Sequence, residues 1–387
     1  MSEDTHIIHS DDSAEKSEIQ DSEHRAPSIS IATVLWPIIL GLGAVSIIGA
    51  ATFEPDMFAR MWRTLNPLIM LGALGMVAAR IFFGGARLSY VSHGRLSFWG
   101  GIKGQLAWDF ASNITPSLVG GAPIAAYYIT KQTSDPSRDR IRFGEVTAFM
   151  MFILLLDQTW FTLSVPILLV AAMFMDVIPS SAGLVGSYMA VLYLVLFMVW
   201  TLIFGYATLF RPQLLTRFVD WLCRIRFLRK YRERAKTEME EYQERAGAIR
   251  SQPLSFFVNG LLLTGLTWTA RYFLVVFIVW SVHPAVDQIL LLMRSIAMTI
   301  SALIVPTPGG AGGIEALYAL YFSSVMPTAF LAATLFVWRF LGYYIFLGIG
   351  VLMSTRQIHR SIRKRKKRDS NIHESPNEND VVPTDDS

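Results

Sequence analysis

The chain contains the run Thr307-Pro308-Gly309-Gly310-Ala311-Gly312-Gly313-Ile314-Glu315 inside an otherwise hydrophobic segment. An earlier hydrophobic segment is broken in the same way by Thr115-Pro116-Ser117-Leu118-Val119-Gly120-Gly121. Lipid cannot satisfy backbone groups that leave a helix, so such breaks are tolerated only where protein buries them or where they line a wet cavity. Paired broken helices in the two halves of a chain are typical of transporter binding sites. The two runs therefore predict a membrane protein that moves a substrate, and we expect that substrate to be a lipid.

The composition supports a membrane location. Of the 387 residues, 52% are hydrophobic, and the mean hydropathy is +0.41, which is too apolar for an ordinary soluble domain of this length. Six stretches are long enough to span a bilayer: residues 31–51, 65–83, 146–172, 182–210, 254–282 and 329–353. The breaks lie in two further apolar regions, 98–130 and 287–325. The predicted fold is an all-α membrane protein, a bundle of about six spanning helices with two opposed re-entrant helical hairpins.

Flanking segments differ in composition from this membrane domain, which we place at residues 31–355. Residues 1–30 are acidic and 356–387 are charged, and both are predicted to be disordered cytoplasmic tails. The first has no basic start, so we do not expect a cleavable signal peptide. The loop at 211–252 is basic, and its first part has the pattern of an amphipathic helix. That helix could lie on the inner leaflet or be merely solvated, and the sequence favours neither.

Charge in the connections predicts the orientation. The basic connections start with a group that includes Arg80, Arg87, Arg95 and Lys103, whereas residues 176–186 and 281–285 lack Lys and Arg. Placing basic connections in the cytoplasm puts both termini there and makes the hairpins enter from opposite faces. Whether residues 287–305 re-enter or cross stays open. We expect a multi-pass protein of the cytoplasmic membrane of a prokaryote.

Glu315 is the first candidate site residue, because ionisable side chains in a membrane are costly and are functional candidates. It follows the second glycine turn at the start of a predicted helix. It could hold a coupling cation or proton, pair with a cationic head group, or simply cap its own helix.

The candidate arginines in predicted membrane segments are Arg271, Arg294 and Arg339. A guanidinium in hydrocarbon needs a partner, and phosphate matches its bidentate geometry. Arg339 and Arg271 are the preferred candidates for holding a lipid phosphate. The alternative is internal pairing with Glu315, Asp157 or Asp109, and an empty site could rest in that paired state.

Other polar residues lie close to the first break. Asp109 and Asn113 precede it on the same helical arm, and Asn113 could cap the freed backbone. Asp157 lies in the middle of the third spanning segment and is expected to face a cavity. Glycines in the breaks allow positive φ and close backbone approach, while prolines stop the helix. The residues predicted to shape the site are Pro116, Gly120, Gly121, Pro123, Pro308, Gly309, Gly310 and Gly312.

Several kinds of chemistry have no signature in the sequence. The seven histidines form no ligand cluster, and Cys223 is the single cysteine, so we expect no metal site, no disulfide and no cofactor. We find no phosphate-binding loop and no nucleophile elbow. The expected partners are membrane lipids, anionic or polyprenyl-phosphate-linked, with no nucleic acid. A membrane glycosyltransferase or a second copy of the chain is a further possible partner.

The motifs resemble those of a known family. Residues 308–315 are similar to the P-G-G-x-G-x-x-E motif of the lysylphosphatidylglycerol synthase transmembrane region, also called the flippase-like membrane family. Asn113 to Pro116, Gly120 to Pro123, and the pair Tyr127 and Tyr128 look like its first motif. Arg339 with Tyr343 and Tyr344 is similar to its last-helix pattern.

The resemblance implies a membrane fold that translocates lipids, with Tyr127 and Tyr128 among the site residues. Many relatives have G-E-x-x-R in the first motif, whereas here the glycines are followed by Ala122 and Pro123. This departure leaves another lipid open besides an aminoacylated one. We expect a transporter, flippase or scramblase, and not an enzyme. The alternatives are a lipid-modifying intramembrane transferase and a non-transporting scaffold for a glycosyltransferase.

Overall fold

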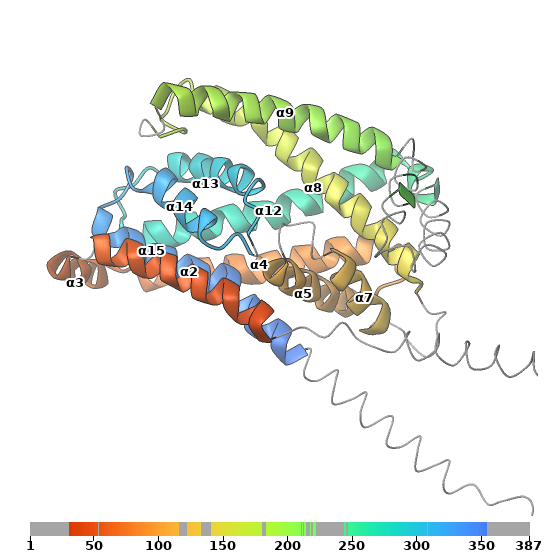
Figure 1. Cartoon of the computed structure of the whole chain (residues 1–387), viewed down its shortest axis with the longest axis horizontal. Helices are drawn as coiled ribbons and strands as arrows, with labels where there is room; N and C mark the ends of the chain where they lie inside the picture. Colours follow the sequence, from red (N-terminus) through yellow and green to blue (C-terminus); the bar gives the residue numbers. More distant parts are fainter. Residues whose placement is uncertain are drawn as a thin grey trace, which may run out of the picture.

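The computed structural model describes residues 31–52, 54–115, 122–132, 141–179, 183–209, 247–307 and 309–353, with a few isolated positions between 211 and 244 (Figure 1). Every regular element in these residues is a helix. They are α2 (Ile31–Thr52), α3 (Pro55–Thr64), α4 (Pro67–Val91), α5 (Phe98–Ile114), α7 (Ala122–Gln132), α8 (Phe143–Ala171), α9 (Gly183–Leu209), α12 (Leu254–Val282), α13 (Gln288–Ala302), α14 (Gly313–Phe322), α15 (Thr328–Arg339) and the π-helical turn η3 (Phe340–Tyr344).

The predicted all-α membrane fold is confirmed. Five helices are long and apolar enough to cross a membrane: α4, α8, most of α9, α12, and the continuous helix from Thr328 to Met353 that contains α15 and η3. The sixth predicted span corresponds to α2, which has 22 residues. The protein is therefore a multi-pass membrane protein.

Each of the two segments predicted to be broken contains two helical arms, separated by residues 115–121 in the first and by residues 303–312 in the second. α5 packs on α7, and α13 packs on α14. The arms have 17 and 11 residues in the first hairpin and 15 and 10 in the second. At about 1.5 Å per residue, no arm covers the roughly 30 Å of a hydrocarbon core. The arm left open by the sequence, residues 287–305, thus forms a helix too short to cross.

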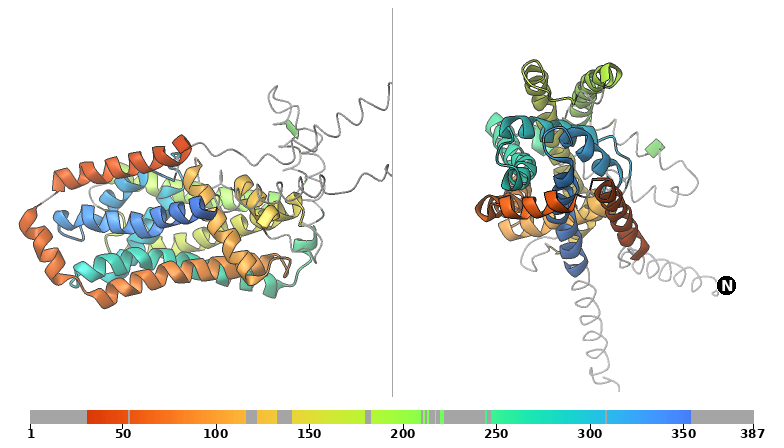
Figure 2. Two further views of the ribbon diagram at one scale, coloured as in Figure 1. Left: turned by 90° about the horizontal axis from the view of Figure 1, so that it is seen from below. Right: turned by 90° about the vertical axis from the view of Figure 1, so that its left-hand side faces the viewer.

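Opposite ends of the bundle carry the two hairpins. α5 and α7 lie toward one end, and α13 and α14 toward the other (Figure 1). The start of α2 and the end of the last helix lie at the same end as α5 and α7 (Figures 1 and 2). This arrangement matches the predicted opposed hairpins. Which end faces the cytoplasm remains a prediction.

Side-chain caps explain where several helices begin. The Asn66 side chain accepts hydrogen bonds from the backbone N–H groups of Leu68 and Ile69 at the start of α4. Asp287 does the same at the start of α13, with N···O distances of 2.8 and 3.1 Å. Such caps satisfy N–H groups that have no partner within the helix. They determine the residue at which each of these helices begins.

Helix α12 forms the centre of the bundle, where it packs against α4, α8, α13 and α15. α4 also packs closely against α5, because glycines meet there. A Cβ atom added to Gly101 would lie 2.2 Å from the carbonyl oxygen of Gly85, so any larger side chain would force the two helices apart. α9, in contrast, packs mainly on α8 and stands at the edge of the bundle (Figure 1).

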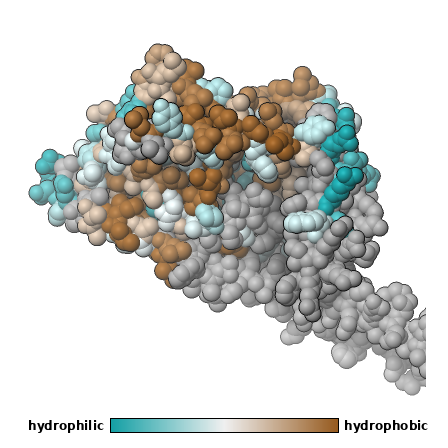
Figure 3. All heavy atoms as spheres, turned by 45° about the horizontal axis from the view of Figure 1, so that its top comes forward, coloured by the Kyte–Doolittle hydropathy of each residue, from teal (hydrophilic) through white to brown (hydrophobic). Residues whose placement is uncertain are grey.

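Hydrophobic side chains cover the outside of the bundle. Large apolar residues such as Leu184, Leu202 and Leu262 are exposed. Figure 3 shows hydrophobic residues over the middle of one face and hydrophilic residues toward its two ends. A surface of this kind fits a lipid environment.

Several predictions concern parts of the chain that the structure does not describe. These are the two tails at 1–30 and 356–387, most of the 211–252 loop, and Pro116, Gly120, Gly121 and Pro308. The proposals for these residues stay predictions.

Candidate functional site

Glu315 and Arg339 form a buried ion pair. The Arg339 Nε and Nη2 atoms both lie 2.6 Å from Glu315 Oε1, and the Glu315 side chain is fully buried. The other carboxylate oxygen accepts a hydrogen bond from the backbone N–H of Gly312 at 2.7 Å. Glu315 thus caps its own helix and also neutralises the charge of Arg339. The helix cap and the internal ion pair, two alternatives that the sequence left open, are present at the same time.

The geometry of the glycine run creates this cap. Gly309, Gly310 and Gly312 have φ of +58°, +68° and +83°, values that L side chains rarely adopt. The chain can therefore turn back on itself and start α14 with Glu315 in its first turn. Arg339 also donates to the carbonyl oxygen of Gly309 at 3.2 Å.

The second break contacts the helix that leads into the first break, next to Tyr343. Its hydroxyl donates to the carbonyl oxygen of Asn113, at the end of α5, at 3.1 Å. A Cβ atom added to Gly309 would lie 2.4 Å from the Tyr343 ring and 2.8 Å from that same oxygen. The second break thus contacts the last turn of the helix that leads into the first. Tyr343 belongs to η3, and π-helical turns are frequent at functional sites.

A second charged cluster is centred on Asp109. Its Oδ1 atom accepts hydrogen bonds from Arg80 Nη2 and Arg271 Nη2, both at 2.8 Å. Arg80 also donates to the carbonyl oxygen of Gly342 in η3 at 3.1 Å. The cluster therefore connects α4, α5, α12 and the last helix.

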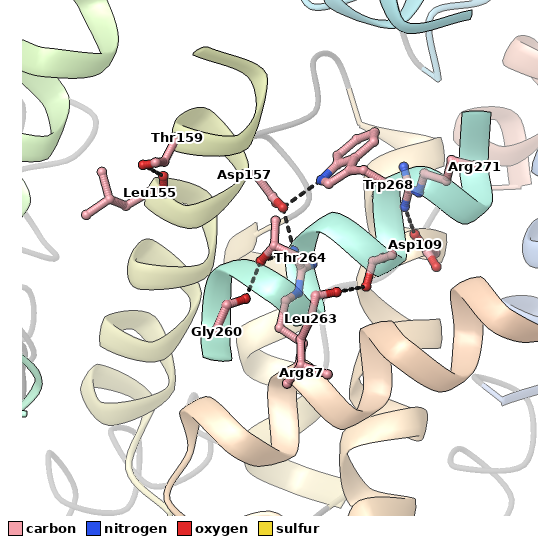
Figure 4. A network of polar contacts seen from close by, with 11 residues as sticks. Arg87, Asp109, Leu155, Asp157, Thr159, Gly260, Leu263, Thr264, Trp268 and Arg271 are labelled. Atoms are coloured by element: carbon pink, nitrogen blue, oxygen red, sulfur yellow. Dashed lines mark hydrogen bonds and ion pairs between the residues drawn. The ribbon is translucent and has the colours of Figure 1, made fainter. Parts of the chain in front are cut away.

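A third cluster surrounds Asp157 in the middle of α8. Its Oδ1 atom accepts hydrogen bonds from Arg87 on α4 and, at 2.7 Å, from the indole N–H of Trp268 on α12 (Figure 4). The Arg271 guanidinium lies over the Trp268 ring, 4.4 Å from its centroid. Figure 4 shows Trp268 between Asp157 and Arg271, so this indole connects the two carboxylate clusters.

Two cavities adjoin these clusters. The first has a volume of about 160 Å³ and lies by the second break, with Gly309, Gly310 and Arg339 in its wall. The second has a volume of about 430 Å³ and is lined by Asp109, Asp157 and residues of α9. Both cavities share five residues, which are Arg80, Ser112, Asn113, Trp268 and Arg271.

Positive charge exceeds negative charge around this shared wall. The clusters of Asp109 and Asp157 bring together three guanidinium groups and two carboxylates, and the Glu315–Arg339 pair is neutral. The Arg271 side chain is 25% exposed, against 8%, 5% and 5% for Arg80, Arg87 and Arg339. Arg271 is therefore the arginine of this group that a ligand in the cavities reaches most easily.

Not all predicted site residues lie at the cavities. Arg339, Arg271, Asp157, Asn113, Asp109, Gly309 and Gly310 line one or both, whereas Glu315, Tyr127, Tyr128 and Gly312 are not among the lining residues. Arg294 is buried elsewhere. It donates to the carbonyl oxygens of Asp176 and Tyr321 and to the Ser324 hydroxyl. The candidate role of Arg294 in holding a lipid phosphate has no support from this geometry, because these groups already use its donors.

Two arginines have a different place from the one that the sequence suggested. Arg80 and Arg87 were assigned to a basic connection, but both lie within α4 and are buried. That assignment was wrong, because Arg80 falls inside the span predicted at 65–83 and Arg87 is also helical, since α4 continues to Val91, past the predicted end of that span. Their spacing of seven residues, two helical turns, puts both on one face of a helix and could have revealed that they point inward.

The described residues include no group of three or more His, Cys, Asp or Glu placed to hold a metal ion. The cavities instead combine guanidinium groups, aromatic rings and apolar side chains. Such a set suits the binding of an anionic group attached to an apolar body.

Comparisons with known proteins agree with the motifs. A family model described as the lysylphosphatidylglycerol synthase TM region matches residues 34–350. A UPF0104 membrane protein of Archaeoglobus fulgidus is 23% identical over 270 residues, which cover 66% of this chain and 75% of that protein. No solved structure matches the chain. With a match across almost the whole described bundle, the chain belongs to the family of the lysylphosphatidylglycerol synthase transmembrane region.

Proposed function

We propose that the protein translocates a lipid with an anionic, phosphate-bearing head group across the bilayer. The membership in a family of lipid-related membrane regions gives the general role. The observation that carries the proposal is Arg271, the most exposed of the cavity arginines, in the wall common to both cavities. A head group held there can be approached from either side of the Trp268–Arg271 stack.

The state of the charged groups supports an anionic ligand. With three guanidinium groups against two carboxylates, a phosphodiester would balance the cluster, whereas a cationic aminoacyl head group would add to the excess. The Nε–H groups of Arg80, Arg87 and Arg271 lack a partner among the described residues. Arginine binds phosphate oxygens through such donors. Asp109 would release Arg271 as the phosphate arrives. Without the ligand, the Asp109 carboxylate takes the place of the phosphate beside Arg271.

Two short hairpins from opposite ends provide a route across the membrane. The last turn of α5, at Asn113, and the glycine turn at Gly309 both lie next to the cavities. Polar backbone is tolerated at membrane depth where it lines a cavity. A head group can thus cross without meeting hydrocarbon.

The test is translocation in proteoliposomes. Tagged phosphatidylglycerol, its lysyl derivative and a polyprenyl phosphate are compared in wild-type protein, Arg271→Ala and Arg271→Lys. We expect wild type to move an anionic lipid, Arg271→Ala to lose most of that rate, and Arg271→Lys to keep part of it, because lysine retains the charge but not the bidentate fork.

A matched control is Arg95→Ala. Like Arg271, Arg95 is partly exposed and paired with a carboxylate, that of Glu145, but it lines neither cavity. The proposal requires that this variant translocate like wild type. Equal rates in Arg271→Ala and wild type, or movement of the lysyl derivative alone, would refute it. A covalent change in the recovered lipid, detected by mass spectrometry, would favour an intramembrane transferase instead.

A further inference from the structure

The larger cavity opens sideways through the wall of the bundle, between α9 and the turn that follows α13. Its lining includes Leu196 and Trp200 of α9 and Ile304 after α13. These three residues are 57%, 54% and 65% exposed, so they face both the cavity and the outside. Because the outer surface here is apolar, the opening leads to the hydrocarbon region and not to water.

Polarity changes along this cavity from one end to the other. The inner end holds the charged groups of Arg271, Asp109 and Asp157, and the outer end holds the apolar side chains of Leu196 and Ile304. Phe161 and Phe197, which line the part near α9, are buried. A ligand that fits must have a charged end, which lies at the inner end of the cavity, and a long apolar end, which lies toward the opening.

We propose that this opening is a slot for one hydrocarbon chain of the lipid whose head group lies at Arg271, an inference that rests on the function proposed above. The slot is defined by Leu196, Trp200, Leu303 and Ile304. It is continuous with the head-group cavity, and this continuity identifies the occupant. The head group moves through the protein while its chain stays in contact with the bilayer core.

A hydrogen bond sets the width of the slot. The Tyr193 hydroxyl of α9 donates to the carbonyl oxygen of Ile300, near the end of α13, at 2.8 Å. Otherwise α9 packs mainly on α8, so this hydrogen bond is a direct link between α9 and α13. Tyr193 therefore holds the two walls of the slot at a fixed spacing.

Site-specific photocrosslinking tests the slot. Benzoylphenylalanine is placed at Leu196 or at Ile304, and the protein is reconstituted in phosphatidylcholine with a small fraction of clickable phosphatidylglycerol or clickable polyprenyl phosphate. The control position is Leu202, which is 68% exposed on the same helix but lies outside the slot. The two probes distinguish an acyl chain from a prenyl chain.

We expect crosslinking at Leu196 and Ile304 to saturate with the probe fraction and to fall several-fold when untagged lipid of the same class is added. Crosslinking at Leu202 should rise in proportion to the probe, as for bulk lipid. Arg271→Ala should reduce the saturable signal at Leu196, because the chain in the slot and the head group at Arg271 belong to one molecule. A signal at Leu196 that does not saturate, or that Arg271→Ala leaves unchanged, would overturn the slot.

Translocation is measured in the same proteoliposomes so that the two proposals can fail separately. Translocation with no saturable crosslinking at Leu196 and Ile304 overturns the slot and leaves the proposed function standing. Saturable crosslinking without translocation supports the slot as a lipid-binding site and refutes the translocase. Leu303→Trp, which fills the mouth, should lower both signals, whereas Leu202→Trp should lower neither.

Discussion

Every arginine at the cavities is held by a carboxylate on a different helix, and this pairing makes a buried charge tolerable. Removing one partner of a buried pair leaves an uncompensated charge and costs about 3–5 kcal/mol. The fully buried Glu315 is the clearest case, since it holds Arg339 and the N–H of Gly312 together. The pair therefore contributes to folding as well as to the shape of the site.

Glu315→Gln should lower thermal stability markedly, because the Arg339 charge loses its only carboxylate partner among the described residues. The double variant Glu315→Gln with Arg339→Gln should recover part of the loss, since no charge is then left unpaired. Melting of the purified protein in detergent measures both. A double variant as unstable as the sum of the two single variants would show that the pair is not coupled.

Neutralising Asp109 should tighten lipid binding. Asp109→Asn removes the carboxylate that competes with a phosphate for Arg271, and it raises the local positive excess. We expect half-saturation of translocation at a several-fold lower fraction of anionic lipid, with a stability loss of about 3–5 kcal/mol because the buried Arg80 loses its carboxylate partner. Dependence of the rate on lipid fraction checks this. An unchanged or higher half-saturation point would contradict the competition between Asp109 and the head group.

Predictability from the sequence differed among residues. Glu315, Arg339, Arg271, Asp109 and Asp157 could be found because a charge in an apolar segment needs a reason. Their partners Arg80 and Arg87 were missed because they come near the end of a span, where a charge also fits a connection. Trp268 gave no signal, since an aromatic residue in an apolar helix is unremarkable until its indole N–H is seen to point at Asp157.

At the scale of the elements, the breaks were predictable and their contacts were not. Proline and glycine stop helices wherever they occur, so the hairpins followed from the sequence. The π-helical turn at Phe340–Tyr344 contains no proline and had no sequence signature. It brings Tyr343 to Asn113 and the Gly342 carbonyl oxygen to Arg80, and so it connects the last helix to both the first hairpin and the Asp109 cluster.

Gly309→Ala should disrupt the contact of the second break with Tyr343 and with the end of α5. The residue has φ of +58°, and a Cβ atom would lie 2.4 Å from the Tyr343 ring, so strain and overlap add. We expect loss of most translocation and lower stability, by about 1–3 kcal/mol for a strained backbone conformation. Gly348→Ala is the matched control, because a Cβ atom there meets nothing within 4 Å. Equal effects of the two substitutions would argue against the contact.

At the scale of the whole molecule, the orientation in the membrane can be tested directly. The predicted cytoplasmic end contains Ser251, and the connection between α12 and α13 contains Ala285; both are exposed. In a Cys223→Ser background, an impermeant maleimide added to intact cells or spheroplasts should label Ala285→Cys at once. Ser251→Cys should react only after lysis. The reverse pattern would invert the protein relative to the basic-connection rule.

The most direct test of the account is the movement of acyl-labelled fluorescent phosphatidylglycerol in proteoliposomes, read as bleaching by external dithionite. We expect wild-type and Arg95→Ala protein to raise the bleached fraction of the lipid above the outer-leaflet fraction that is bleached in protein-free vesicles. Arg271→Ala protein should not raise it. Bleaching by folded Arg271→Ala protein at the wild-type rate would contradict the claim that Arg271 holds an anionic head group on its way across the membrane.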